Sequence, residues 1–151
     1  MARKETCILT NMCMVYQDNR VLVQNRTDPN WPGICFPGGH IEPGESFVDS
    51  TIREIKEETG LDISDLQLCG VKQWTQPNGE YRYIVFLYKT GTFSGAVNAS
   101  SEGEVFWADR ESLPELPLAD GFSSMLEIFL RDELTENYHW LDDGQWKFTN
   151  K

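Results

Sequence analysis

Three glutamates, Glu54, Glu57 and Glu58, stand within one five-residue stretch of the chain. If that stretch is helical, each residue turns the chain by about 100°, so the three carboxylates share an arc of about 100°. Two carboxylates about 6 Å apart repel by roughly 3 kcal/mol at an effective dielectric constant of about 20. A hard divalent cation such as Mg²⁺ or Mn²⁺ removes that repulsion, because it prefers oxygen ligands. A solvated helix face explains the pattern equally well, since runs of charge are usually exposed.

The helix that carries these glutamates is predicted over residues 46–59. Ser46 suits its N-cap, Asp49 suits its first turn, and Gly60 stands where a left-handed C-terminal residue belongs. The apolar side of this helix, which we expect to face the core, consists of Val48, Ile52, Ile55 and Thr59. The arc of glutamates adjoins that side, so we expect the carboxylates at the edge of the core, near the glycine pair that precedes the helix.

The wider spacing is more specific than the glutamates alone. Gly39 is followed after five residues by Glu45, and after seven more by the run Arg-Glu-Ile-Lys-Glu-Glu-Thr-Gly-Leu at 53–61. This segment matches every specified position of the Nudix box, Gly-x5-Glu-x7-Arg-Glu-U-x-Glu-Glu-x-Gly-U, in which U is a bulky aliphatic residue. At average residue usage, such a match arises by chance at roughly one start position in 10⁹. The chain therefore resembles the MutT/Nudix hydrolases, a family that cleaves nucleoside diphosphates linked to another group.

The resemblance implies a metal site. In this family the loop–helix–loop that contains the box binds Mg²⁺ and the diphosphate of the substrate. By position, Glu54, Glu57 and Glu58 would be metal ligands, and the carbonyl oxygen of Gly38 would add another. Metal ions that bridge neighbouring phosphates neutralise their charge and lower the pKa of an attacking water. A carboxylate then accepts the proton of that water, and the sequence leaves open which glutamate does so.

Two further residues of the box and one acidic residue outside it complete the implied site. Arg53 would orient the glutamates, and Glu45 would support the start of the helix or the outer shell of the metal. The family often takes another catalytic and metal-binding glutamate from a loop before a later strand. Glu102, five residues before Trp107, fits that position best, with Glu104 as the alternative. An ordinary acidic loop residue is the other interpretation.

The identity of the substrate follows less directly from the sequence. At 151 residues, the chain is similar to the short MutT-type members, which hydrolyse oxidised purine nucleoside triphosphates such as 8-oxo-dGTP to the monophosphate and pyrophosphate. Pro77, sixteen residues beyond Leu61, has a spacing associated with ADP-ribose pyrophosphatases, so ADP-ribose or another linked nucleoside diphosphate is the alternative. A non-catalytic Nudix-fold ligand-binding protein and an acidic Ca²⁺-binding module are alternatives of a different class.

Candidate substrate-binding residues lie outside the acidic helix. His40 stands where MutT-type enzymes often place a lysine, and Asp120 would either hydrogen-bond a purine or cap the helix that begins near residue 122. Phe36 and Trp74 would stack on a base, as would Trp31 and Tyr81, although aromatic residues on strands are more often part of the core.

The elements that must position these residues form an α+β pattern. Strands are expected at 6–16, 21–25, 34–36, 66–75, 81–90, 105–108, 138–141 and 145–148. A second helix is expected over 122–134, a helical turn over 111–116 and a polar loop over 91–103. With the resemblance, we expect residues 1–151 to form a single Nudix hydrolase domain, a mixed sheet sandwiched between helices.

Composition sets limits on partners and location. The net charge is −11, and the segments 42–65 and 102–120 carry −6 and −5 of it, so we expect no broad nucleic-acid-binding surface. No apolar run approaches the length of about 20 residues that spans a bilayer. Cys7, Cys13, Cys35 and Cys69 show no metal-ligand spacing and are expected to be reduced and mostly buried. We therefore expect a cytoplasmic monomer or homodimer with a nucleotide substrate.

Overall fold

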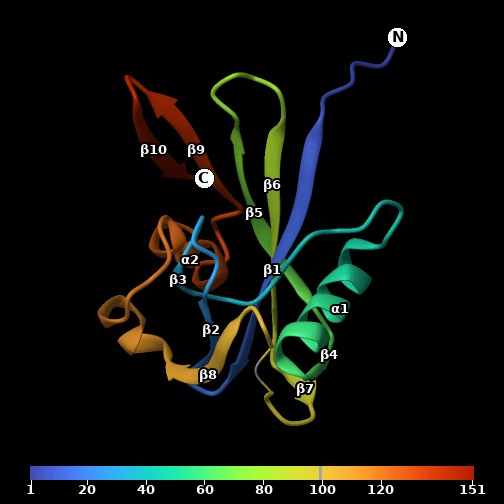
Figure 1. Cartoon of the computed structure of the whole chain (residues 1–151), viewed down its shortest axis with the longest axis vertical. Coiled ribbons are helices and arrows are strands. Elements are labelled where there is room, and N and C mark those ends of the chain that lie inside the picture. Colours follow the sequence, from blue (N-terminus) through green and yellow to red (C-terminus); the bar gives the residue numbers. More distant parts are fainter. Residues whose placement is uncertain (99) are drawn as a thin grey trace.

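The computed structural model describes residues 1–98 and 100–151 (Figure 1). Its helices are α1 (Phe47–Thr59), the 3₁₀ helix η1 (Arg110–Glu115) and α2 (Phe122–Leu130). Its strands are β1 (Cys7–Gln17), β2 (Arg20–Arg26), β3 (Gly33–Cys35), β4 (Asp62–Ser64), β5 (Gln67–Thr75), β6 (Arg82–Thr90), β7 (Thr92–Ser94), β8 (Gly103–Asp109), β9 (Glu136–Asp142) and β10 (Gln145–Asn150).

A mixed sheet runs through the middle of the molecule in the order β10-β9-β5-β6-β1-β2-β3, and β8 pairs with β2. The strand β1 pairs in parallel with β6, β5 pairs antiparallel with β6, and β9 pairs in parallel with β5. Figure 1 shows α1 on one side of this sheet and α2 on the other. The predicted α+β fold, a mixed sheet between helices, is confirmed.

The long strand β1 is apolar on both faces because both faces of the sheet are covered. Met12 and Met14 pack into the core cluster that contains the buried side of α2. Cys13 and Val15 point the other way, into the cluster that contains Ile55 of α1. This alternation makes β1 the central wall between the two helices.

The caps of α1 agree with the sequence, and its buried side agrees in part: Ile55 and Thr59 are buried as predicted, and Ile52 is partly buried against the same core cluster as Ile55. Ser46 Oγ accepts a hydrogen bond from the N–H of Asp49 at 3.3 Å, and Gly60 is left-handed with φ of 81°. Val48, predicted to face the core, is 40% exposed. The buried residues of α1 are Ser50, Thr51, Ile55, Glu58 and Thr59.

The buried side of α1 also contains polar residues. The side-chain amide of Asn11 on β1 donates to Ser50 Oγ at 3.0 Å, and both residues are buried. Glu58 lies on this buried side rather than at its edge.

Two other expectations are corrected. The segment expected to be a loop over 91–103 contains β7, which pairs antiparallel with β4. The second helix ends at Leu130 rather than 134, because the charged residues 131–133 offer no apolar side to pack and Arg131 is already extended. Of the cysteines, Cys13 and Cys35 are buried, Cys69 is partly buried and Cys7 is exposed; all four are free.

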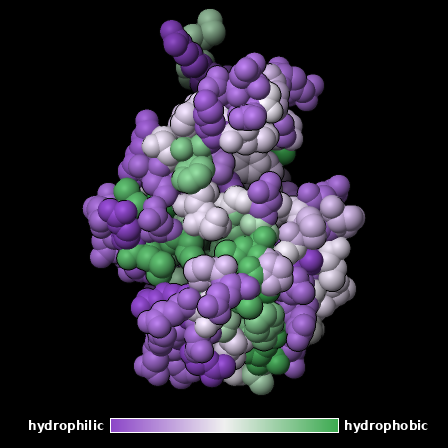
Figure 2. Space-filling view, turned by 90° about the vertical axis from the view of Figure 1, so that its left-hand side faces the viewer, coloured by the Kyte–Doolittle hydropathy of each residue, from purple (hydrophilic) through white to green (hydrophobic). Residues whose placement is uncertain are grey.

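The face shown in Figure 2 is mainly hydrophilic, and its hydrophobic side chains lie across the middle and lower part of the molecule. None of the described helices is long and apolar enough to cross a lipid bilayer.

Candidate active site

The glycine pair before α1 forms a turn that lies against both β1 and the helix. The N–H of Asn11 donates to the carbonyl of Gly39 at 2.9 Å, and the Asn11 side-chain oxygen accepts from the N–H of Gly39 at 3.1 Å. A Cβ at position 38 would overlap the backbone of Asn11, and a Cβ at position 39 would overlap the carboxyl group of Glu54. Glycine at these two positions therefore lets the backbone approach the acidic side of α1.

Glu58 lies under this turn and is only 3% exposed. Its Oε2 accepts a hydrogen bond from the N–H of Gly38 at 3.0 Å, whereas Oε1 has no hydrogen-bond partner among the described residues. Burial, together with the neighbouring carboxyl group of Glu102, raises the pKa of Glu58 to about 9. A buried carboxyl oxygen without a partner is costly, and a bound cation would satisfy it.

Two other acidic side chains accompany Glu58. The side chain of Glu54 is 14% exposed, and burial raises its pKa, although Arg53 opposes that shift. Glu102 comes directly before β8, lines the same cleft as Glu58, and contributes to the raised pKa of Glu58. The structure thus brings together Glu54, Glu58 and Glu102, which are distant in sequence.

Arg53 fastens the preceding loop to α1. Its guanidinium forms a two-pronged pair with Glu45, at 2.8 Å from Nε and 2.9 Å from Nη2, and also donates to the carbonyl of His40 at 3.1 Å. It bonds Glu54 at 2.9 Å and Glu57 at 3.3 Å from the same Nη1. The bonds from Arg53 to Glu45 lower the pKa of Glu45 to about 2. Arg53 is therefore placed to orient the box glutamates.

Glu57 lies apart from the other carboxylates. Its side chain is 58% exposed and is held by Arg53, and it does not line the cleft that contains Glu54, Glu58 and Glu102. Within residues 1–98 and 100–151, no three His, Cys, Asp or Glu side chains stand ready to enclose a metal ion. Glu54, Glu58 and Glu102 line the same end of the cleft but do not surround a point at which a metal ion would be enclosed.

The donor set nevertheless fits a hard divalent cation. All the candidate ligands are oxygens, and Glu58 Oε1 is buried with no partner among the described residues. Burial, together with neighbouring carboxyl groups, raises the pKa values of Glu54 and Glu58, and a bound cation would stabilise their charged forms.

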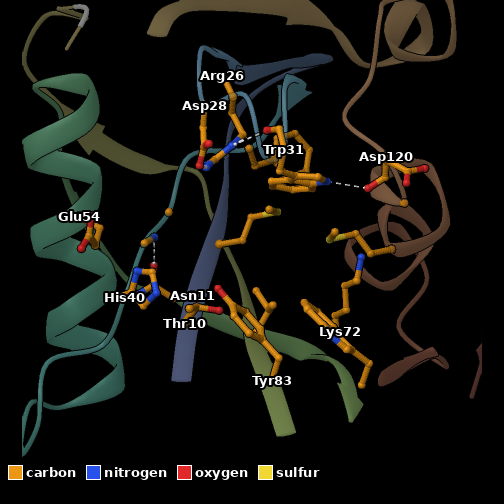
Figure 3. Close-up of a pocket in the computed structure, with 18 of the residues that line it drawn as sticks. Thr10, Asn11, Arg26, Asp28, Trp31, His40, Glu54, Lys72, Tyr83 and Asp120 are labelled. Atoms are coloured by element: carbon orange, nitrogen blue, oxygen red, sulfur yellow. Dashed lines mark hydrogen bonds and ion pairs between the residues drawn. The ribbon is translucent and has the colours of Figure 1, made fainter. Parts of the chain in front are cut away.

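A cleft of about 1280 Å³ begins at these carboxylates and continues across the sheet. Figure 3 shows Glu54 at one side of it and Asp120 and Lys72 at the other, with Tyr83 between. A cleft of this size accommodates a whole nucleotide, because small-molecule sites are typically about 300–1,000 Å³.

Trp31 lies in the part of the cleft away from α1, next to Asp120 (Figure 3). Its indole N–H donates to the carbonyl of Asp120 at 2.8 Å, and the guanidinium of Arg26 lies 5.0 Å from its ring centroid. The carboxylate of Asp120 is exposed and does not cap α2, whose N-cap is Gly121 without a side-chain bond. Asp120 is thus free to accept hydrogen bonds from a ligand, and the capping alternative is wrong.

The other predicted substrate-binding residues differ in their access to the cleft. His40 is exposed and lines the cleft near Glu54, and Trp74 lines it while stacking on Tyr83 at 4.5 Å. Phe36 is only 1% exposed and packs edge-on against Phe122 and Phe129. Phe36 also borders the cleft, but at 1% exposure its ring belongs to the core and offers little surface for stacking a base.

Sequence reasoning missed Lys72 and His139, which also line the cleft. A signal for Lys72 was present, since residues two apart on a strand share a face and Trp74 was already a candidate. His139 lies on the C-terminal hairpin, whose pairing with β5 could not be inferred from local pattern.

Residues 9–129 of the chain match the family model described as NUDIX domain. The chain is 32% identical over 125 residues to the uncharacterized Nudix hydrolase YvcI of Bacillus subtilis, covering 80% of this chain and 78% of that protein. It is 36% identical over 108 residues to an ADP-ribose pyrophosphatase of Methanocaldococcus jannaschii, covering 68% and 62%.

A third relative is much longer than the chain. The NAD-capped RNA hydrolase NudC of Vibrio atlanticus is 28% identical over 102 residues, and the match covers 68% of this chain but only 37% of NudC. Among solved structures, the mutator MutT protein from Bacillus halodurans superimposes with a TM-score of 0.79 at 23% identity, over 95% of this chain and 97% of that one. At that identity the structural match shows the fold alone.

Proposed function

This chain belongs to the Nudix family of hydrolases, and from that premise we propose that it hydrolyses a (deoxy)nucleoside triphosphate to the monophosphate and pyrophosphate. The observation that carries the proposal is the single cleft, which has the carboxylates of α1 at one end and Trp31 with the free carboxylate of Asp120 at the other. The phosphates belong at the acidic end, where cations gather, and the base belongs at the aromatic end. An oxidised purine nucleotide such as 8-oxo-dGTP is within this class.

The residues that would hold Mg²⁺, or Mn²⁺ in its place, are Glu54, Glu57, Glu58 and Glu102 with the carbonyl oxygen of Gly38. When bound, such a cation neutralises phosphate charge and lowers the pKa of water. Glu57 joins the set only by leaving its bond with Arg53, which its 58% exposure allows.

The chain's own residues supply orientation and proton transfer. Arg53 keeps the loop 40–45 fixed against α1 through Glu45 and the His40 carbonyl, so the glycine turn and the carboxylates keep one spacing. Glu57, Glu58 and Glu102 are the groups proposed to take the proton from the attacking water. His40, exposed beside Glu54, is placed to contact the phosphates.

ADP-ribose is the second candidate substrate. The 36% identity to an ADP-ribose pyrophosphatase favours it, and so does the length of the cleft, which reaches Trp146 and Phe148 of the C-terminal hairpin. Pro77, in contrast, lies in the turn between β5 and β6. The N–H of Gln76 closes this turn by donating to the carbonyl of Tyr81 at 3.0 Å. The position of Pro77 therefore has a structural reason and does not by itself favour ADP-ribose.

A non-catalytic ligand-binding role is the weakest of the alternatives, because every glutamate of the box is present. Changing Glu58 to Gln is expected to lower kcat by at least a hundredfold while the circular dichroism spectrum is kept. The matched control is Glu115→Gln, an exposed glutamate of η1 away from the cleft, which is expected to turn over like the wild type. Wild-type turnover in the Glu58 variant would contradict the assignment.

A comparison of kcat/KM across a panel of candidate substrates identifies the preferred one. The panel contains GTP, ATP, 8-oxo-dGTP, ADP-ribose and a dinucleoside polyphosphate, each with Mg²⁺ and with Ca²⁺. The nucleotide products are separated by ion-exchange chromatography, because a triphosphate gives a monophosphate and pyrophosphate whereas ADP-ribose gives AMP and ribose 5-phosphate. Nucleoside triphosphates are expected to be hydrolysed with Mg²⁺ and not with Ca²⁺. A clear preference for ADP-ribose would replace the first candidate by the second.

We also propose that residues 1–151 form a single Nudix domain. The parallel pairing of β9 with β5 supports this, since it places the C-terminal hairpin in the same sheet as the rest of the fold. A cytoplasmic location is proposed on the basis of the four free cysteines, which suit a reducing compartment.

A further inference from the structure

Gln24 is a fully buried amide without a hydrogen-bond partner. It lies on β2, it is 0% exposed, and neither its side-chain nitrogen nor its side-chain oxygen has a partner among the described residues. Burying an amide without hydrogen bonds costs free energy, so such a group needs an explanation of its own. An apolar side chain of similar shape would fill the position without that cost. Packing alone therefore does not explain a glutamine at position 24.

Oε1 of Glu58 is the other buried side-chain atom without a partner in the described part of the chain. The two groups are complementary, because an amide nitrogen donates hydrogen bonds and a carboxylate oxygen accepts them. A hydrogen bond to a carboxylate is roughly twice as strong as one between neutral groups. A bond from the Gln24 amide to Glu58 would therefore satisfy a donor and an acceptor that are otherwise unpaired.

Gln24 lies on the face of β2 that is turned toward α1. Side chains alternate along a strand, and Val23 packs into the core cluster that contains the buried side of α2. Leu22, which shares a face with Gln24, belongs instead to the cluster that contains Ile55 of α1. Ile55 and Glu58 are both buried and stand three residues apart, so they are neighbours on the helix. Gln24 and Glu58 therefore point into the same layer between sheet and helix.

The two strands that flank β2 also lead to Glu58. On one side, Gln24 pairs with Cys35 of β3; burial raises the pKa of the Cys35 thiol, and the charge of Glu58 adds to that rise. On the other side, Gln24 pairs with Val105 of β8. Glu102, directly before β8, adds to the effect of burial in raising the pKa of Glu58. The carboxyl group of Glu58 is thus close to both flanks of Gln24.

We propose that Gln24 is a positioning residue that acts through Glu58: when a divalent cation is bound, the side-chain amide of Gln24 donates a hydrogen bond to Glu58 Oε1 and holds the carboxylate in one orientation. The inference rests on the proposed hydrolase function and adds to it a residue outside the Nudix box. The other oxygen, Oε2, is already held by the N–H of Gly38 at 3.0 Å. Each carboxylate oxygen has two lone pairs, so a bond from Gln24 leaves Oε1 able to bind a cation as well.

Two other roles for Gln24 lead to different expectations. A residue that contacts the substrate has to line the cleft, and Gln24 does not. A residue that only supports the fold would be hydrogen-bonded in the free protein, whereas both polar atoms of Gln24 lack a partner among the described residues. The positioning role predicts that loss of the amide weakens cation binding and turnover but leaves the metal-free protein as stable as before.

The first test measures stability and cation binding without a nucleotide. Gln24→Met keeps the length of the side chain and removes both polar atoms, so in EDTA its Tm is expected to equal or exceed that of the wild type. Mn²⁺ is expected to raise the wild-type Tm, because it binds the folded state. In the variant that rise is expected to be at most half as large, and the Kd for Mn²⁺, measured by calorimetry, at least fivefold higher. The matched control is Leu22→Met on the same face of β2, which is expected to keep the wild-type Kd for Mn²⁺.

The second test measures turnover with Mg²⁺ and the best substrate of the panel. Gln24→Met is expected to lower kcat at least tenfold and to change KM less than threefold, because Gln24 does not touch the substrate. In a protein that already carries Glu58→Gln, the same change is expected to lower kcat less than twofold. Such non-additivity is the behaviour of two residues that act through one contact.

The outcomes separate this inference from the function beneath it. If no nucleotide is hydrolysed, the proposed function fails, while a Mn²⁺ affinity that depends on Gln24 would still support the inference. If nucleotides are hydrolysed and Gln24→Met keeps the wild-type kcat and Mn²⁺ affinity, the inference alone fails.

Three further results would also overturn the inference. A Gln24→Met protein that melts well below the wild type in EDTA, or does not fold, would show that the amide is bonded in the free protein. An equal loss of kcat with and without Glu58→Gln would show that Gln24 acts through another group. Wild-type protein that binds no Mn²⁺ would contradict both the inference and the proposed function.

Discussion

The carboxyl group of Glu58 illustrates how a functional residue can oppose stability. Its burial on the sheet side of α1, beside Glu102, raises its pKa to about 9. In an unfolded chain the same group ionises near its ordinary pKa of about 4.3. Between these two values the folded state holds a proton that the unfolded state releases, so stability decreases as the pH rises through this window. Below it, both states are protonated and nothing is lost.

Without metal, Glu58→Gln is therefore expected to be at least as stable as the wild type. Glutamine keeps the shape and cannot ionise, so its advantage in Tm is expected to grow from pH 5 to pH 9. The slope of that advantage is at most about 1.4 kcal/mol per pH unit. Thermal unfolding in EDTA at several pH values measures it. A Tm difference that shrinks as the pH rises would contradict the assignment of a raised pKa to Glu58.

At the scale of elements, the turn at Gly38 and Gly39 offers two substitutions with different expected results. A Cβ at position 39 meets the end of the flexible Glu54 side chain, whereas a Cβ at position 38 meets the backbone of β1 at Asn11. Gly39→Ala is therefore expected to keep the fold and to raise the Mg²⁺ concentration for half-maximal activity by at least tenfold. Gly38→Ala is expected to lower Tm by several degrees.

Activity titrated with Mg²⁺, measured beside thermal unfolding, distinguishes the two variants. If Gly39→Ala lowered Tm as much as Gly38→Ala and kept the wild-type Mg²⁺ dependence, Glu54 would have no part in holding the cation.

Local chemistry made some elements predictable and left others hidden. The caps of α1 at Ser46 and Gly60, and the β5–β6 hairpin with its Asn78-Gly79 turn, follow from residues close in sequence. The burial of Ser50 in α1, in contrast, accompanies its bond with Asn11, which lies 39 residues away and appears on no helical wheel.

The same distinction applies to the site. The box glutamates were predicted because their spacing lies within one helix, and Glu102 was predicted through the resemblance. The position of Glu57 depends on its bond to Arg53, and the environment of Lys72 depends on Gly121 and Asp120, which come from a distant part of the chain. Contacts of that kind are set by tertiary packing rather than by local pattern.

For the whole molecule, the excess of acid has a location in the structure. The segment 42–65 contains α1 with Glu54 and Glu58, and the segment 102–120 contributes Glu102 to the same end of the cleft. A triphosphate that approaches the end with Glu54, Glu58 and Glu102 is negatively charged like the chain itself. At the other end of the cleft, the positive charge of Lys72 offsets the negative charge of Asp120. The two ends of the cleft should therefore respond differently to metal and to salt.

The last prediction separates these two ends in one protein. Without divalent cations, GTP is expected to bind at least a hundredfold more weakly than with Mg²⁺, because no cation bridges its phosphates to the acidic end and the negative charge of the chain repels them. Guanosine, which has no phosphate, is expected to bind equally well with and without Mg²⁺. Raising the salt concentration should partly restore metal-free GTP binding, since the Debye length falls from about 10 Å at 0.1 M to 3 Å at 1 M. Calorimetry with both ligands measures this, and tight GTP binding in EDTA at low salt would show that the carboxylates do not face the phosphates.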